Sequence, residues 1–123
     1  MKNIKANLIS LGLNEKQADI YITLLKLGTS LIGSLEKKLK LHKQIIYNEL
    51  EKLILKDLVL VTTKNNRRHF QAADPEVLVQ KLENQKKLAE NLVPDLHSLV
   101  GWEKGVSEVK IYEGIKGFQA FHR

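Results

Sequence analysis

Apolar residues recur at helical spacing over the first 28 positions and predict two short helices. Asn3 can cap the first helix with its side chain, and Gly12 can close it, because glycine tolerates the left-handed conformation that often follows a helix. Asn14 can cap the second helix, which would stop at Gly28. The second helix would then carry one apolar stripe, formed by Ala18, Tyr21, Leu24 and Leu25.

Two more helices are expected in the next part of the chain. Ser30 can cap a third helix that runs to Lys40, and a short turn at 40–42 leads into a fourth helix at 43–56. Along the fourth helix, apolar side chains are spaced by four and then three positions. This spacing predicts one buried face, formed by Ile46, Leu50 and Leu53.

Two runs of β-forming residues follow the fourth helix, at 59–63 and 69–72. The segment 64–68 between them is polar and cationic and contains two asparagines, which tolerate positive φ angles. These features predict a β-hairpin whose tip is 64–68. The predicted fold class of residues 1–73 is therefore mainly α with a small β-hairpin.

A long helix is predicted after the hairpin, with Asp74 as its N-cap and Pro75 in its first turn. Gly101 should end this helix, and Pro94 should kink or restart it, because proline lacks the backbone N–H that a helix interior uses. Spacings of four and three alternate along the helix, which is typical of helices that pair in a coiled coil. We therefore expect a dimerisation helix at 74–101 whose heptad seam is formed by Leu78, Leu82, Gln85, Ala89, Leu92, Leu96 and Leu99.

The last segment, 102–123, has a strand-like run at 109–112 and an apolar stub at 118–121. A strand needs a neighbour to pair its backbone groups, and the run has only the stub as a later partner. We therefore expect 102–123 to be the start of a C-terminal effector domain that is truncated in this chain. The segment should be poorly ordered or held by a dimer partner.

The excess of positive charge is confined to one part of the chain. Twenty Lys and Arg residues against fourteen Asp and Glu residues give a net charge of +6. Residues 1–73 hold thirteen basic and six acidic side chains, whereas residues 74–123 hold seven basic and eight acidic ones. A strongly basic domain favours a polyanionic partner such as nucleic acid.

Several kinds of chemistry are excluded by composition and spacing. The chain contains no Cys, which removes disulfides, thiolate catalysis and thiolate zinc sites. The four His residues are isolated from one another, and no phosphate-binding loop or nucleophile elbow is present. No apolar run approaches the roughly 18 residues of a membrane span. We therefore expect no enzyme activity, no metal, no cofactor and no membrane association, in a protein of the cytoplasm.

Three helices, a hairpin with a basic tip and a long helix, in this order, are typical of a winged helix-turn-helix DNA-binding unit. Steps of about 100° per residue from the inward-facing Ile46 place Gln44 and Asn48 on the outer face of the fourth helix. Both side chains can pair with adenine in the major groove, so we expect them to read bases. The surrounding cations should contact phosphates. These are Lys38, Lys40, His42, Lys43, Lys52, Lys64, Arg67 and Arg68 (the basic rim).

Five segments in a fixed order carry a family resemblance. They are LGLNEKQADIY at 11–21, LLKLG at 24–28, IYNELEKL at 46–53, KDLV at 56–59 and FQAADPE at 70–76. Over residues 4–80 the sequence resembles the TrmB-type, or sugar-specific, transcriptional regulators, and the resemblance resumes at 109–114.

This resemblance implies a winged-helix dimer on palindromic operators, with the recognition helix at 43–56 and the wing at 59–72. Residues 63–68 of the wing would lie on the flank of the DNA site. A separate C-terminal domain binds sugars in many members, and a sugar-type effector would act only through that domain, which is largely absent from this chain. Lys40 and Asp57 depart from the pattern, because the family usually has glycine at both positions.

Two other interpretations remain open. The unit could be a winged-helix module for protein–protein contact that docks through the heptad seam, or a non-specific binder of double-stranded nucleic acid. The basic rim favours DNA over protein, since a protein-docking wing does not need it. Gln44 and Asn48 favour sequence-specific binding, because phosphate binding needs only cations.

Overall fold

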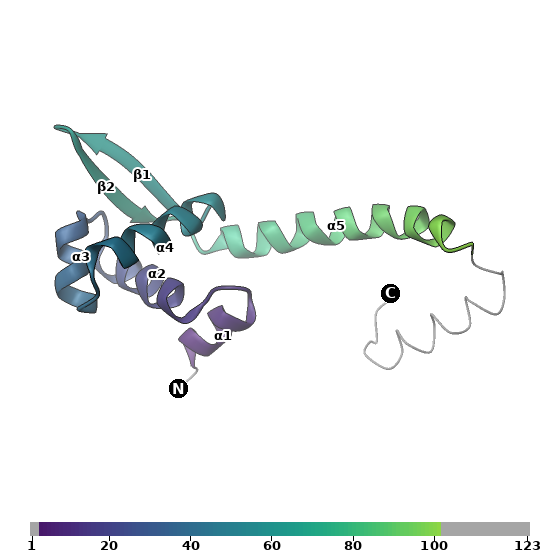
Figure 1. Cartoon of the computed structure of the whole chain (residues 1–123), viewed down its shortest axis with the longest axis horizontal. Coiled ribbons are helices and arrows are strands. Elements are labelled where there is room, and N and C mark those ends of the chain that lie inside the picture. Colours follow the sequence, from purple (N-terminus) through teal and green to yellow (C-terminus); the bar gives the residue numbers. More distant parts are fainter. Residues whose placement is uncertain (1–2, 102–123) are drawn as a thin grey trace. The chain divides into compact units, whose positions relative to one another are not determined.

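The computed structural model describes residues 3–101, so the expected strand at 109–112 and the rest of the expected effector segment lie outside the described residues. Residues 1–81 form one unit and residues 82–123 a second. The described elements (Figure 1) are α1 (Ile4–Ser10), α2 (Glu15–Leu27), α3 (Ile32–Leu39), α4 (Lys43–Leu55), β1 (Val59–Lys64), β2 (Arg67–Ala72) and α5 (Glu76–Leu99). The predicted fold class, mainly α with a small β-hairpin followed by a long helix, is confirmed.

The two asparagine caps predicted from the sequence are present. The Oδ1 atom of Asn3 accepts a hydrogen bond from the backbone N–H of Ala6 at 2.9 Å. Asn14 and Gln17 form a reciprocal capping box at the start of α2, in which each side chain accepts from the backbone N–H of the other residue, at 2.7 and 3.1 Å. Because the two asparagine caps are local contacts, the sequence pattern was enough to predict them. The reciprocal contact of Gln17 was not predicted.

The predicted cap of the third helix is wrong. The helix α3 begins at Ile32, after Leu31, without a side-chain cap. Ser30 instead pairs its backbone N–H and C=O with those of Phe70, each at 2.8 Å, and its hydroxyl donates to the carbonyl of Gly28 at 2.9 Å. The bridge to β2 occupies the backbone of Ser30, so the N-cap position falls on Leu31 and the helix starts one residue later than predicted.

The core of the first unit lies between α2, α3, α4 and the base of the hairpin. Tyr21 is buried at its centre and donates its hydroxyl hydrogen bond to the carbonyl of Ala73 at 2.9 Å. Leu25, which was expected in the same stripe, is exposed. The largest fully buried side chains are Tyr21, Phe70, Ile20, Leu24, Leu35, Ile46, Leu50, Leu53, Leu58 and Val59.

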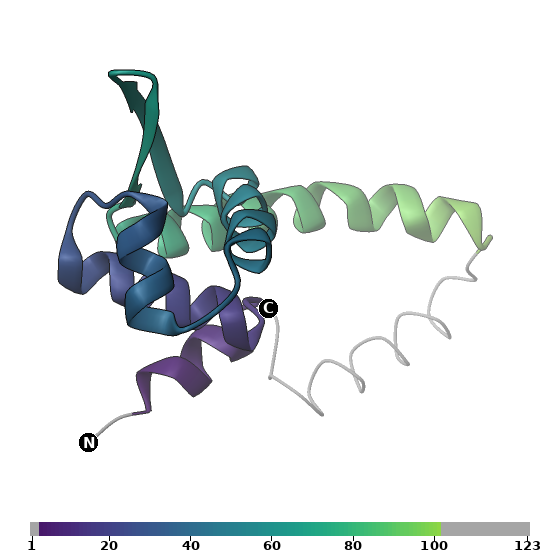
Figure 2. The same cartoon turned by 60° about the vertical axis from the view of Figure 1, so that its left-hand side comes forward.

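The hairpin has a shorter tip than predicted. The strands β1 and β2 are antiparallel and stay paired as far as Lys64 and Arg67, so the loop consists only of Asn65 and Asn66. Their φ angles are +53° and +63°, and a two-residue turn of type I′ requires positive φ at both positions. Because asparagine tolerates this conformation, the strands extend further, and Figure 2 shows the hairpin projecting beyond the helices.

Two non-glycine residues outside the hairpin also have left-handed backbone conformations. Lys40, at the C-cap of α3, has a φ of +55°, and Asp57, just after α4, has a φ of +65°. These are the two positions where the resemblance to the TrmB-type regulators led us to note an absent glycine. Both turns therefore have the left-handed conformation that glycine adopts easily. A non-glycine residue in this conformation lowers the stability of the fold by about 1 kcal/mol.

The helix α5 starts as predicted, with the carboxylate of Asp74 accepting from the backbone N–H of Glu76 at 2.9 Å. A restart at Pro94 was one of two expected effects of this proline, and it does not occur, because α5 is a single helix from Glu76 to Leu99. The carbonyl of Glu90, which loses its helical partner to the proline, belongs to an exposed residue. Water can therefore satisfy that carbonyl.

Candidate nucleic-acid interface

The helix α4, which the sequence predicted as the recognition helix, presents one buried and one exposed face. Ile46, Leu50 and Leu53 are fully buried, as the sequence spacing predicted. His42 is the N-cap of the helix, and its Nδ1 atom accepts from the backbone N–H of Gln44 at 3.1 Å. Nδ1 is therefore used within the protein, and Nε2 remains as the ring's donor toward an anion.

The two predicted base-reading side chains contact each other. The amide Nε2 of Gln44 donates to Oδ1 of Asn48 at 3.1 Å, one helical turn further along the exposed face. Within residues 3–101, neither side chain has another partner. The Asn48 amide nitrogen and the Gln44 carbonyl oxygen therefore remain as a donor and an acceptor for a ligand.

All eight members of the basic rim are exposed, and they belong to elements that pack together. Lys38 and Lys40 end α3, which contacts both α4 and β2. Lys64 and Arg67 are direct partners across the hairpin. Like charges placed opposite each other destabilise a β-ladder, so this pair raises the free energy of the unliganded hairpin and favours an anionic partner.

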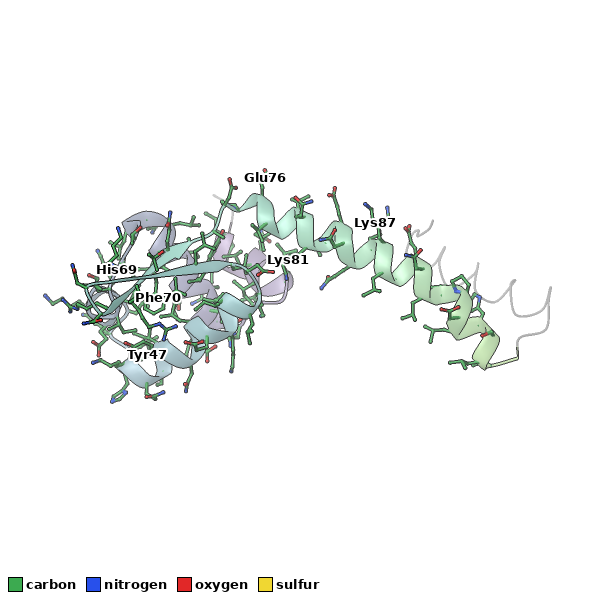
Figure 3. The ribbon with its side chains drawn as sticks, turned by 90° about the horizontal axis from the view of Figure 1, so that it is seen from above. Tyr47, His69, Phe70, Glu76, Lys81 and Lys87 are labelled. Atoms are coloured by element: carbon green, nitrogen blue, oxygen red, sulfur yellow. The ribbon has the colours of Figure 1, made fainter. Side chains whose placement is uncertain are left out.

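Arg68 differs from its neighbours because it has a partner within the protein. Its guanidinium donates to the Glu51 carboxylate of α4 at 2.8 Å and lies 5.2 Å from the centre of the Phe70 ring. Tyr47 of α4 packs edge-on against Phe70 (Figure 3), with ring centroids 6.3 Å apart. These contacts link β2 to one side of α4. Sequence reasoning missed them, because no local pattern pairs residues on different elements.

A second polar contact links α4 to the start of α2. The Oε1 atom of Glu49 accepts from the side-chain amides of Asn14 and Gln17 at 3.1 and 3.0 Å. Lys56 donates to Oε1 of Gln17 at 3.0 Å and to the carbonyl of Gly12 at 2.9 Å. The Asn14 cap was predicted from the sequence, but the connection of the capping box to Glu49 depends on the packing of α2 against α4.

The environment of Glu49 changes its acidity. Burial of the carboxyl opposes ionisation, but the hydrogen bonds from Asn14 and Gln17, together with the charges of Lys52 and Lys16, outweigh burial. The pKa of Glu49 is therefore lowered from its ordinary value of 4.5. The hydrogen bonds between α2 and α4 therefore favour the charged form of the Glu49 carboxyl.

This pKa shift predicts a pH dependence of stability. A carboxyl whose pKa is lower in the folded state stabilises the fold above its unfolded-state pKa, and the contribution is lost as the pH falls through the folded-state value. We expect the free energy of unfolding of the wild type to decrease below a pH of about 4.5, and that of Glu49→Gln to decrease less steeply. Urea denaturation between pH 3 and pH 6 measures both slopes. Equal slopes for the wild type and Glu49→Gln would show that the Glu49 carboxyl does not cause this pH dependence.

Most of the heptad seam is exposed in the single chain. Leu78 packs against the core of the first unit. Beyond it, α5 has no buried residue, and the apolar side chains Leu82, Leu92, Leu96 and Leu99 are exposed. The sequence interpretation left out four further exposed apolar residues on this helix and its end: Val79, Leu88, Val93 and Val100.

Two negative findings apply to residues 3–101. Within that range, no group of three or more His, Asp or Glu side chains is placed to hold a metal ion. None of the described helices is long and apolar enough to cross a membrane.

A helix-turn-helix with exposed amides on its second helix, followed by a hairpin that carries cations, defines the winged-helix class of DNA-binding protein. The family model for the sugar-specific transcriptional regulator TrmB matches residues 8–76, which is more than half of the chain. The chain therefore belongs to the TrmB family of transcriptional regulators. No curated protein matches the sequence.

Solved structures of similar fold share little sequence with this chain. The YusO protein from Bacillus subtilis has a TM-score of 0.53 and 13% identity, over 96% of this chain and 83% of that chain. ZitR from Lactococcus lactis has a TM-score of 0.49 and 17% identity, over 89% and 75% of the two chains. BpsR from Bordetella bronchiseptica, whose DNA binding is regulated by 6-hydroxynicotinic acid, has a TM-score of 0.49 and 16% identity, over 85% and 74%. At these identities, the likeness to YusO concerns the fold alone.

Proposed function

We propose that this chain is a sequence-specific DNA-binding regulator that binds a palindromic operator as a homodimer. The helix α4 enters the major groove, where Gln44 and Asn48 read bases. The wing, with residues 63–68 at its end, lies on the flank of the site. The basic rim contacts phosphates on both sides of the groove.

The observation that carries this proposal is the exposed amide pair on α4, surrounded by cations from three elements. The Gln44–Asn48 hydrogen bond of 3.1 Å fixes the two amides relative to each other before DNA is bound. Less conformational freedom is then lost on binding. The repulsion between Lys64 and Arg67 is relieved when a phosphate lies between or beside them.

Dimer formation is proposed for the heptad seam of α5. Stepping about 100° per residue from Leu82 places Ala89, Val93 and Leu96 within about 40° of it. These residues give α5 an apolar face that no described residue covers beyond position 81. A second copy of the same helix would bury this face and give the two-fold symmetry that a palindromic operator needs.

An effector site is proposed only for the C-terminal segment. The family description refers to sugars. A sugar-type effector would bind a domain that begins within 102–123, and these residues lie outside the described part of the chain. We place the protein in the cytoplasm, where its DNA target would be.

Selection of bound duplexes from a random DNA pool tests the proposed function directly. Recovery of an inverted repeat supports sequence-specific binding by a dimer. Recovery of duplexes without a common sequence, with binding that depends only on salt, identifies a non-specific binder. Absence of binding to any duplex refutes the proposal and favours a protein-docking module.

Substitutions in the two parts of the interface should have different effects. Arg67→Ala should weaken binding to every duplex by a similar factor and reduce the slope of log affinity against log salt by about 0.9, because one phosphate contact is lost. Asn48→Ala should cost roughly 1–3 kcal/mol on the selected duplex and little on a scrambled one. Fluorescence anisotropy titrations at several salt concentrations measure both quantities. Equal effects of the two substitutions on both duplexes would contradict the assigned roles.

A further inference from the structure

Two glutamates hold α4 from opposite sides. Glu49 and Glu51 are separated by two positions, which corresponds to about 200° around a helix axis. Glu49 faces the start of α2, where its Oε1 atom accepts from Asn14 and Gln17 at 3.1 and 3.0 Å. Glu51 faces β2, where its Oε2 atom accepts from Arg68 at 2.8 Å. Glu51 therefore lies at the edge of the base-reading face, beside Gln44, whereas Glu49 lies between that face and the buried face of the helix.

The buried face of α4 positions the helix by packing, without directional bonds. Ile46, Leu50 and Leu53 pack through aliphatic contacts, which have little directional preference. Hydrogen bonds, such as those that Glu49 and Glu51 accept, weaken steeply when their geometry changes. A rotation of about 10° moves a side-chain tip that lies about 5–6 Å from the helix axis by roughly 1 Å. Such a shift is enough to break a bidentate contact between an amide and a base.

We propose that Glu49 and Glu51 are positioning residues that fix the rotation of α4 about its own axis, and thereby the direction in which Gln44 and Asn48 face the DNA. The inference rests on the proposed function. Neither glutamate needs to touch DNA in this role. Each acts through a partner on another element: Glu49 through the capping box of α2, and Glu51 through Arg68 of the wing.

The test compares the affinity for the duplex recovered by selection with the affinity for a scrambled duplex of the same composition. Glu49→Ala and Glu51→Ala should each lower this ratio by about tenfold, which is the loss of roughly one bidentate base contact. The affinity for the scrambled duplex should not fall, because a negative charge is removed from a surface that meets phosphates. Melting curves establish that each variant is folded at the assay temperature.

Glu36→Ala is the matched control for charge. Glu36 lies on α3, and its side chain makes no hydrogen bond or ion pair with any residue in the described range. Its removal should raise the affinities for both duplexes by the same factor and leave their ratio unchanged. A glutamate that acts only through its charge would behave in this way.

Two further variants separate positioning from other roles. In Glu49→Gln, the remaining carbonyl oxygen can still accept from Asn14 and Gln17. The ratio of its affinities for the selected and scrambled duplexes should therefore be close to that of the wild type. If Glu51 acts through Arg68, then Glu51→Ala combined with Arg68→Ala should have the same ratio as Arg68→Ala alone. Failure of both expectations would overturn the positioning role.

The failure of this inference can be distinguished from the failure of the proposed function. A wild type that does not discriminate between the two duplexes refutes the proposed function. A wild type that discriminates, with ratios for folded Glu49→Ala and Glu51→Ala equal to that of Glu36→Ala, refutes only the positioning role. If Glu49→Ala does not fold, Glu51→Ala alone tests the positioning role. The Glu51 side chain is 54% exposed, so its removal should leave the domain folded, whereas the Glu49 side chain is only 13% exposed.

Discussion

Replacement of Leu82 and Leu92 by glutamate is expected to give a monomer whose affinity for the operator is lower by a factor of about 100 or more. The two side chains are 47% and 46% exposed in the single chain, so the substitutions do not disturb a described core. In a paired helix they would place four carboxylates along one interface. Burial of unpaired charge in such an interface is strongly unfavourable.

The matched control adds the same charges to the other side of α5. Asn84 and Asn91 lie about 180–200° from Leu82 around the helix axis, and their replacement by glutamate should leave both the dimer and its operator affinity nearly unchanged. Sedimentation velocity and anisotropy titrations report the two properties. A wild type that stays monomeric at high protein concentration would exclude the seam as a dimer interface.

Phe70→Ala is expected to have the largest effect on folding. Phe70 is fully buried, contacts Tyr47 and Arg68, and pairs its backbone with Ser30. Loss of such a ring costs about 3–5 kcal/mol, which approaches the whole stability of a small domain, about 5–15 kcal/mol. The free energy of unfolding of the first unit should therefore fall by a large fraction in Phe70→Ala, and its melting temperature should fall with it.

Circular dichroism melting and urea denaturation measure this loss. Leu60→Ala, on the neighbouring strand, is the control, because Leu60 is 53% exposed. This control substitution should lower the free energy of unfolding by less than about 1 kcal/mol. A Phe70→Ala variant as stable as Leu60→Ala would show that the wing does not depend on this ring.

The sequence was sufficient for features that depend on neighbouring residues. The caps at Asn3 and Asn14 need only a side chain and an N–H three positions away. The buried face of α4 follows from the helical period alone. For the same reason the order of helices, hairpin and long helix could be predicted, since each element has its own start, stop and period.

Features that depend on distant residues could not be read from local patterns. Ser30 suits a helix cap, but Phe70, forty positions later, occupies its backbone groups. Arg68 was expected at a phosphate because of its charge, and its ion pair with Glu51 in the folded hairpin was not predicted. The identities of both residues were visible in the sequence, but the pairing depends on how β2 packs against α2 and α3 and on the contact of Arg68 with α4.

The like-charge pair of Lys64 and Arg67 gives ionic strength two opposite effects on this protein. Dissolved ions screen the repulsion within the free hairpin and so stabilise the unbound domain. The same ions compete with the domain for the phosphates and so weaken its complex with DNA. A higher salt concentration therefore has two opposite effects at this one turn: it lowers the repulsion within the free hairpin tip, and it weakens the attraction of the same two cations for phosphate.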